Sequence, residues 1–317
     1  MDDKRKKKVL IGVPLALVAL VLIYFFAIFP RAGLLGLEKG YVEVTIDKEG
    51  KADFKVTDKK PKGWVTLKEV SPFAANAIVV SEDWAFYDHN GYDPNQIKEA
   101  VNEALEGERT RGASTISQQV IKNVFLTPEK TLTRKLKEIM YSTYMEKNVS
   151  KEKILETYLN IAEFAPGVYG IKAAAKHYFN KAPKKLSPKE GAFLAMLLPS
   201  PKRYSQSFRE KKMTDFAKNS VDNILEKMVV AKYLPKEDLV KAKKSHFNWE
   251  KEAKKEAKAK TTFKKRSRKS RRGGPSGGGE KINYRVDSDL MLEENPDFDD
   301  DAIDEDLDGI KAEFNVQ

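Results

Sequence analysis

Residues 81–93 read SEDWAFYDHNGYD, and two adjacent acids, Glu82 and Asp83, stand near the start of this stretch. Taken alone, two neighbouring carboxylates are most simply exposed acids on the surface of a helix. A carboxylate can also act as a general base, because it can accept the proton of a hydroxyl group while a new bond forms. The neighbouring sequence is needed to distinguish these two interpretations.

Four more segments follow on the C-terminal side. They are RGASTISQQVIKNVF from Arg111, RKLKE from Arg134, KEKILETYLNIAEF from Lys151 and GVYGIKAAAKHYFNK from Gly167. From Ser71 to about Leu239, apolar residues recur three and four positions apart, which is the spacing of amphipathic helices. One such stripe, Ile154, Leu155, Tyr158 and Leu159, follows a candidate N-cap at Ser150. The pattern predicts a mainly α body.

The order and spacing of the five segments resemble the peptidoglycan glycosyltransferase family, the transglycosylase module of bifunctional penicillin-binding proteins. The resemblance runs from about Trp64 to Tyr204. The monofunctional branch, the biosynthetic transglycosylases, fits because it pairs one membrane anchor with one such domain and has no transpeptidase. The resemblance implies a mainly α, lysozyme-like fold in which a larger and a smaller lobe flank a cleft.

The resemblance also implies the reaction. Such an enzyme transfers the lipid-linked growing chain onto the 4-hydroxyl of lipid II, which forms β-1,4 bonds with inversion and releases undecaprenyl pyrophosphate. Glu82 matches the general base of the family, and Glu138 matches its second essential acid, which lies by the donor phosphates or a metal, or orients their cationic partners. Locally, Glu138 is also spaced i, i+4 from Arg134 and can simply pair with it on a helix.

Nine residues are predicted to bind the substrate. They are Asp83, Ser114, Thr115, Gln118, Gln119, Lys122, Lys130, Arg134 and Lys135. The three lysines match family positions near the lipid pyrophosphate, where an ammonium group acts as a point charge on phosphate. Hydroxyl and amide groups can bond sugar or phosphate oxygens. The adjacent Gln118 and Gln119 cannot both point the same way, so we expect one to bind and the other to support.

The remaining motif residues are expected to be structural. We expect His89 to be a buried hydrogen-bonding residue, because His177 and His246 show no ligand spacing with it. Phe86, Tyr158 and Phe179 are most simply core residues, and Glu156 and Asn160 match a motif that supports the fold around the cleft. We expect no required cofactor and no dedicated metal site, although Mg²⁺ or Mn²⁺ could stimulate the reaction by screening the pyrophosphate.

The N-terminal segment is predicted to be a retained membrane anchor. Residues 9–29 form a run of 21 residues without a charge, preceded by five basic residues at positions 4–8. A helix of this length would be about 31 Å long, which matches a bilayer core. A cleaved signal peptide would have a shorter apolar run and a small-residue cleavage site. The charge distribution predicts a single-pass protein of the bacterial inner membrane, with residues 1–8 in the cytoplasm and the catalytic domain in the periplasm.

Composition separates the other regions. We expect a linker with a possible short hairpin in residues 30–63, the glycosyltransferase domain in residues 64–249 and a disordered charged tail in residues 250–317. In the tail, residues 251–272 hold 12 basic and 2 acidic side chains, whereas residues 287–317 hold 13 acidic side chains and one lysine. The chain lacks cysteine, which excludes disulfides, thiolate metal sites and a cysteine nucleophile.

The expected partners are lipid II, the lipid-linked glycan chain and membrane lipid, with other wall-synthesis proteins as candidates for the tail. The net charge of +11 would suit nucleic acid, but the periplasmic placement argues against it.

Two alternative functions remain. A lytic transglycosylase or lysozyme shares the fold but needs no lysine-rich pyrophosphate site. An inactive or catalytically weak membrane scaffold could recruit wall-synthesis partners, although intact Glu82 and Glu138 argue against it.

Overall fold

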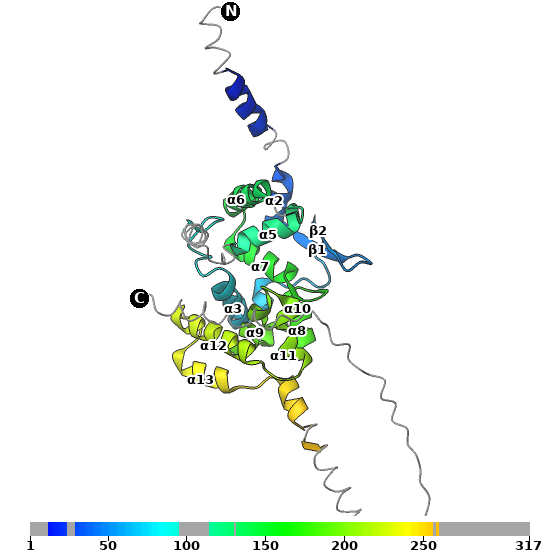
Figure 1. The fold of residues 1–317 in the computed structure, drawn as a ribbon, viewed down its shortest axis with the longest axis vertical. Helices are drawn as coiled ribbons and strands as arrows, with labels where there is room; N and C mark the ends of the chain where they lie inside the picture. The colour runs from blue at the N-terminus through cyan, green and yellow to red at the C-terminus, as the bar shows by residue number, and fades with distance from the viewer. Residues whose placement is uncertain (1–11, 24–28, 95–113, 130, 256–257, 260–317) are drawn as a thin grey trace, which may run out of the picture. The chain divides into compact units, whose positions relative to one another are not determined.

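The computed structural model describes residues 12–23, 29–94, 114–129, 131–255 and 258–259 (Figure 1). All of them belong to one compact unit, Met1–Thr262. The predicted mainly α body is confirmed, because helices form most of the described secondary structure.

The elements follow in chain order. The helices are α2 (Arg31–Lys39), α3 (Pro72–Glu82), α5 (Ile116–Phe125), α6 (Leu132–Glu146), α7 (Lys151–Ile161), α8 (Ile171–Phe179), α9 (Pro188–Leu197), α10 (Pro201–Tyr204), α11 (Gln206–Arg209), α12 (Asp215–Val230) and α13 (Lys236–Lys244). The strands are β1 (Tyr41–Ile46), β2 (Ala52–Thr57), β3 (Glu163–Ala165) and β4 (Val168–Tyr169), and two short 3₁₀ helices are η1 (Leu67–Glu69) and η2 (Pro183–Lys185).

The predicted hairpin is confirmed. Strands β1 and β2 pair antiparallel, with Tyr41 opposite Thr57 and Ile46 opposite Ala52. Gly50 lies in the connecting turn with a φ of 81°, a conformation that glycine adopts without steric cost. Strand β1 contacts α7, and β2 contacts α5 and α2. The segment expected to be a linker therefore contains a hairpin that packs on the helical body.

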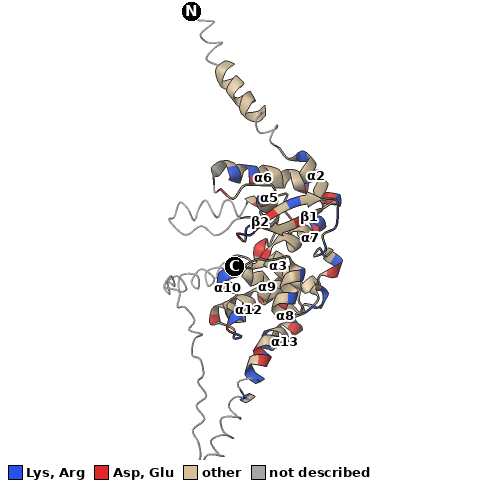
Figure 2. Cartoon of the chain, turned by 90° about the vertical axis from the view of Figure 1, so that its right-hand side faces the viewer, with Lys and Arg blue, Asp and Glu red and all other residues tan. Residues whose placement is uncertain are grey.

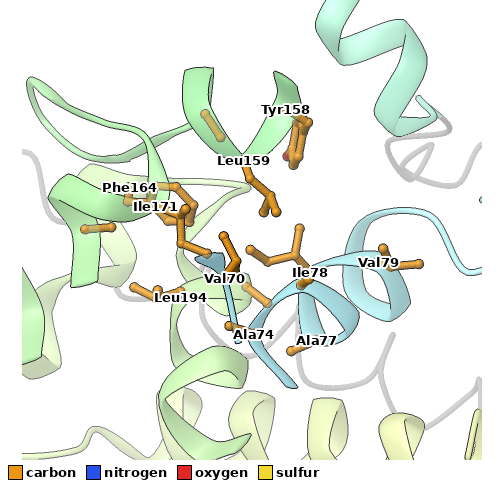
Figure 3. Packing of buried hydrophobic residues seen from close by; sticks show 14 of the residues in the cluster. Val70, Ala74, Ala77, Ile78, Val79, Tyr158, Leu159, Phe164, Ile171 and Leu194 are labelled. Atoms are coloured by element: carbon orange, nitrogen blue, oxygen red, sulfur yellow. The ribbon is translucent and has the colours of Figure 1, made fainter. Parts of the chain in front are cut away.

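Close packing of α3 against α9 and α12 positions the first catalytic candidate. Helix α3 is rich in alanine, and Ala74, Ala77 and Ile78 are fully buried. A Cβ atom at Gly191 of α9 would lie 2.6 Å from the Cα of Ala74, so glycine allows the two backbones to approach. Figure 3 shows Ile78 among the apolar side chains that join α3 to Leu159 of α7. This packing fixes the end of α3, where Glu82 lies.

Helix α7 has the N-terminal boundary and the support role that its sequence predicts. Ser150 is its N-cap residue, and the apolar stripe behind it is buried. Trp64 Nε1 donates to Glu156 Oε1 at 3.0 Å. Val65 N donates to Asn160 Oδ1 at 2.8 Å, and Asn160 Nδ2 returns a bond of 2.8 Å to the Val65 carbonyl. The prediction that Glu156 and Asn160 support the fold is confirmed.

The two ends of the chain lie largely outside the described residues. Residues 12–23 of the predicted anchor are helical. Within the described part of the chain, no helix combines the length and the apolar character needed to cross a membrane. Residues 250–255 and 258–259, at the start of the predicted disordered tail, are helical, so the expectation of disorder is wrong there. The rest of the predicted tail lies outside the described residues.

Candidate active site

Glu82 ends α3 and is held by two side chains from other helices. Gln119 of α5 donates from Nε2 to Glu82 Oε2 at 2.9 Å. The Tyr158 hydroxyl of α7 lies 3.4 Å from the same oxygen and donates at 3.1 Å to Gln119 Oε1. Both contacts end on Oε2, so Oε1 has no hydrogen-bond partner among the described residues. The contacts of Oε2 thus orient the carboxylate, and Oε1 is available to accept a proton.

The surroundings of Glu82 raise its pKa and so make it a stronger base. Burial raises the pKa of Glu82, while the hydrogen bonds from Gln119 and Tyr158 and the charge of Lys122 lower it and only partly offset the burial. Burial also raises the pKa of Tyr158 well above 10, with a further contribution from Glu82, so its hydroxyl stays protonated and remains a donor. A carboxylate with a raised pKa is a stronger base than an exposed one.

Asp83, predicted to bind the substrate, is placed differently from Glu82. Its carboxylate is buried and accepts the Ile116 backbone N–H at 2.9 Å. His89 Nε2 lies 2.9 Å and 3.0 Å from its two oxygens. Ile116 is the first residue of α5, and a negative charge is favourable at a helix N-terminus. The carboxylate of Asp83 therefore binds protein groups, and the prediction that His89 is a buried hydrogen-bonding residue is confirmed.

Thr115 and Gln118 form the N-terminal cap of α5. The Thr115 side chain accepts the backbone N–H of Gln118 at 3.2 Å, and Gln118 Oε1 accepts the Thr115 N–H at 3.3 Å, a capping box. Thr115 also donates to the Gly91 carbonyl at 2.9 Å. Both residues are buried. Gln118 therefore supports the helix, as expected for one member of the pair, and Gln119 reaches Glu82. The expectation that the other member binds substrate stays a prediction.

Glu138 is buried on α6 and binds two cations. Arg134 Nε lies 3.2 Å from Glu138 Oε1, and Lys135 Nζ lies 3.1 Å from Oε2. Lys135 Nζ also donates to Ser114 Oγ at 3.0 Å and to Gln118 Oε1 at 3.2 Å. Figure 2 shows basic residues in blue on α6. Glu138 thus makes the local pair with Arg134 and also orients Lys135 toward the start of α5.

Lys122 links this cationic cluster to Glu82. Burial and the positive charges of Arg134 and Lys135 lower the pKa of Lys122, whereas Glu138 and Glu82 raise it, with burial the largest cause. Both carboxylates are therefore close enough to interact electrostatically with the same ammonium group. The site combines an oriented base with three cations that can bind a phosphate-bearing leaving group.

A protein-family model described as transglycosylase matches residues 50–229, more than half of the chain. The chain belongs to the transglycosylase family. This assignment confirms the resemblance drawn from the five sequence segments.

Three curated relatives carry the description biosynthetic peptidoglycan transglycosylase. The relative from Bdellovibrio bacteriovorus is 41% identical over 143 residues, which cover 45% of this chain and 57% of that protein. The relative from Shewanella frigidimarina is 47% identical over 139 residues, covering 44% and 62%. The relative from Vibrio parahaemolyticus is 41% identical over 170 residues, covering 53% and 76%. The chain thus spans about 60% of the length of the first two.

The crystal structure of penicillin-binding protein 1A from Haemophilus influenzae is also similar, with a TM-score of 0.31 and 18% identity. The match covers 66% of this chain and 21% of that one. A similarity at this level is too low to bear on the fold.

The structure brings together most of the predicted site residues. Glu82, Gln119 and Lys122 form one group, and Glu138 with its two cationic partners forms the other. Lys130 lies outside the described residues. In the described part of the chain, no group of three or more His, Cys, Asp or Glu side chains is arranged to hold a metal ion.

Tyr158 is the site residue that sequence reasoning missed. Its place in an apolar helical stripe predicts a core residue, and the ring is indeed buried. The hydroxyl, however, reaches Glu82 and Gln119. A usable signal is that a buried tyrosine hydroxyl normally needs a hydrogen-bond partner, which an apolar stripe alone does not provide.

Proposed function

We propose that the protein is a peptidoglycan glycan-strand polymerase. It transfers the lipid-linked growing chain onto the 4-hydroxyl of lipid II, forms β-1,4 bonds with inversion and releases undecaprenyl pyrophosphate. The observation that carries the proposal is the Glu82 carboxylate, oriented by Gln119 and Tyr158 and coupled to Lys122. The family and the description of the relatives as biosynthetic peptidoglycan transglycosylases support the same reaction.

In this mechanism Glu82 takes the proton of the attacking hydroxyl. The oxygen of lipid II attacks the anomeric carbon of the growing chain from the face opposite the pyrophosphate, so one C–O bond forms as another breaks and the configuration inverts. The electron pair of the broken bond leaves with the pyrophosphate, and the proton remains on Glu82 until it is released to solvent. The reaction needs no redox cofactor, because it transfers only a proton and a glycosyl group.

The cationic residues are proposed to stabilise the leaving group. Lys122, Lys135 and Arg134 would bind the pyrophosphate oxygens, and Glu138 would hold two of these cations in place. Preorganised charges stabilise the developing negative charge without reorganising during the reaction. We propose that Mg²⁺ or Mn²⁺ is not required but stimulates the reaction by screening the same pyrophosphate.

The substrates and the location follow from the same proposal. Both substrates carry lipid tails, so we propose that the domain works at the periplasmic face of the inner membrane, anchored by a single span in residues 9–29. The lysine-rich start of the chain and its apolar run support this placement. We also propose a lysozyme-like, bilobal fold, which is supported by two groups of packed helices, one around α3 and α9 and one around α5 and α7.

The test of the proposed function is incubation of the full chain with purified lipid II in detergent, with the products separated on a gel. We expect glycan polymer that grows with time. A parallel incubation with preformed glycan strands tests the lytic alternative. Shortened strands without polymer from lipid II would establish a lytic enzyme, and lipid II binding with neither product would establish a scaffold.

The rate of polymerisation should have a bell-shaped pH dependence. Glu82 must be ionised to accept a proton, and because burial raises its pKa, activity is lost as pH falls at a higher pH than the value of about 4.3 for an exposed glutamate. Lys122 must be protonated to bind phosphate, and because its pKa is lowered, activity falls with rising pH before about 10.4. Measuring kcat/KM from pH 4 to 11 checks both the acidic limb, where activity falls with falling pH, and the alkaline limb, where activity falls with rising pH.

Lys122→Arg provides the control for the alkaline limb. Arginine stays charged throughout this range, so the variant should lose the limb if Lys122 causes it. An alkaline limb at the same pH in wild type and variant would contradict the assignment of Lys122. An acidic limb near pH 4 would contradict the raised pKa of Glu82.

Replacing Tyr158 with phenylalanine should lower kcat about tenfold. The variant loses the hydroxyl that contacts Glu82 and Gln119, and a hydrogen bond to a charged group is worth about 1.5–3 kcal/mol. Since the Tyr158 hydrogen bond lowers the pKa of Glu82, the acidic limb should also move to higher pH. Polymerisation rates over the same pH range check both effects. A variant with unchanged kcat and an unchanged limb would show that Tyr158 is a core residue only.

A further inference from the structure

A second group of polar side chains lies next to the base, and all of its members are buried except Lys151, whose side chain is 20% exposed. Its members are Asp83, His89, Ser117, Glu146 and Lys151. Side-chain exposure is 0% for Asp83, 5% for His89 and 1% for Glu146. Buried charges are costly unless they are paired. In this group the charged members pair with one another.

Glu146, the last residue of α6, is the centre of this group. Its Oε2 lies 2.7 Å from Lys151 Nζ, at the start of α7. Its Oε1 accepts a hydrogen bond from Ser117 of α5 and lies 3.7 Å from His89 Nδ1. One carboxylate thus contacts α5, α7 and the loop that follows α3. None of these contacts is part of the proposed chemistry.

The contacts continue from Glu146 to the base. His89 faces Glu146 with Nδ1 and binds Asp83 with Nε2. Asp83 is the neighbour of Glu82 in the chain and accepts the first backbone N–H of α5. Gln119, in the first turn of α5, donates to Glu82. The group therefore fixes the end of α3 relative to the helix that orients the base.

We propose that Glu146 is a positioning residue for Glu82, acting through His89 and Asp83. The inference rests on the proposed function, because positioning has meaning only for an active base. Glu146 touches neither the base nor the cationic cluster directly. Its carboxylate pairs with Lys151 at the start of α7, accepts a hydrogen bond from Ser117 of α5 and lies against His89 in the loop after α3. It therefore ties together the segments that surround Glu82.

Positioning predicts a specific kinetic effect. A displacement of a catalytic group by about 1 Å can lower the rate about 10²-fold. Glu146→Gln keeps the size of the side chain but removes the charge that pairs with Lys151 and faces His89. We expect kcat to fall about 10- to 100-fold. KM for lipid II should stay within about twofold, since the cationic residues on α5 and α6 keep their own partners.

The experiment compares the full chain, Glu146→Gln and a matched control by lipid II polymerisation and thermal unfolding. The control is Glu190→Gln on α9, because Glu190 is also buried and pairs with a lysine, Lys181, at 2.7 Å. Rates are expressed per folded molecule. The control should lose some thermal stability and keep kcat, whereas Glu146→Gln should lose kcat beyond any loss of stability.

Each outcome decides the inference. A Glu146→Gln variant that is destabilised like the control but keeps kcat would overturn the inference. A variant in which only KM rises while kcat is unchanged would overturn it as well. If Glu146→Gln does not fold, Ser117→Ala removes one hydroxyl that donates to Glu146, and it should lower kcat about threefold. Unchanged kcat in that variant would also overturn the inference.

A failure of the proposed function gives a different result. In that case the wild-type chain itself makes no polymer, and the positioning role falls with the reaction. Polymer from the wild type with no effect of Glu146→Gln or Ser117→Ala on kcat would reject the positioning role alone.

Discussion

Glu82→Gln is expected to lower kcat for lipid II polymerisation by about 10²- to 10⁴-fold, the contribution typical of a positioned general base. Glutamine has almost the same shape and can still bond Gln119 and Tyr158, but it cannot take a proton from the attacking hydroxyl. The variant should therefore fold and bind lipid II. Because burial raises the pKa of Glu82, removal of this carboxyl group should leave thermal stability unchanged or increased.

Initial polymerisation rates, lipid II binding and thermal unfolding together check this prediction. Glu152→Gln is the control, since it makes the same chemical change at an exposed position of α7 and should keep full activity. A Glu82→Gln variant with more than a tenth of the wild-type kcat would exclude Glu82 as the base. Equal losses in both variants would indicate a general defect of the preparation.

Glu138→Gln is expected to lower kcat/KM about 10²-fold, the scale seen when one preorganised charge is removed from an active site. When the Glu138 carboxylate is removed, Arg134 Nε and Lys135 Nζ lose the oxygens that lie 3.2 Å and 3.1 Å from them, respectively. Glu138 also raises the pKa of Lys122. Its loss should therefore lower that pKa further and move the alkaline limb of the rate to lower pH. Steady-state kinetics against pH check both expectations.

The control for Glu138 is Glu226→Gln, which removes a carboxylate that also pairs with a lysine, Lys243, on a neighbouring helix. This substitution should leave kcat/KM unchanged, because Glu226 joins α12 to α13 and contacts no proposed site residue. A Glu138→Gln variant with activity near that of the control would show that Glu138 is an ordinary helix ion pair. A loss of rate without any shift of the alkaline limb would point to a role that does not involve Lys122.

Much of the site was predictable from local sequence. The helical spacing around Ile154 predicts α7, because the period of an α-helix is set by neighbouring residues. The hairpin expected within residues 30–63 is also a local feature, because a tight turn such as the one at Gly50 depends on a few neighbouring residues. The order of the five segments identifies the family, and with it Glu82 and the cationic positions. His89 was expected to be buried because a lone histidine without ligand spacing is more often structural than catalytic.

What the sequence by itself determined is therefore the helical class and the family, and it supplied the residues of the candidate site as a prediction. The tertiary structure decided which side chains meet. Asp83 binds the start of α5, Gln119 rather than Gln118 reaches the base, and the Tyr158 hydroxyl joins them. These partners are 33 to 39 residues apart. Local periodicity cannot encode such contacts, because they depend on how α3, α5 and α7 come together in the fold. The position of α3 depends in turn on its close approach to α9 at Gly191, where no Cβ intervenes.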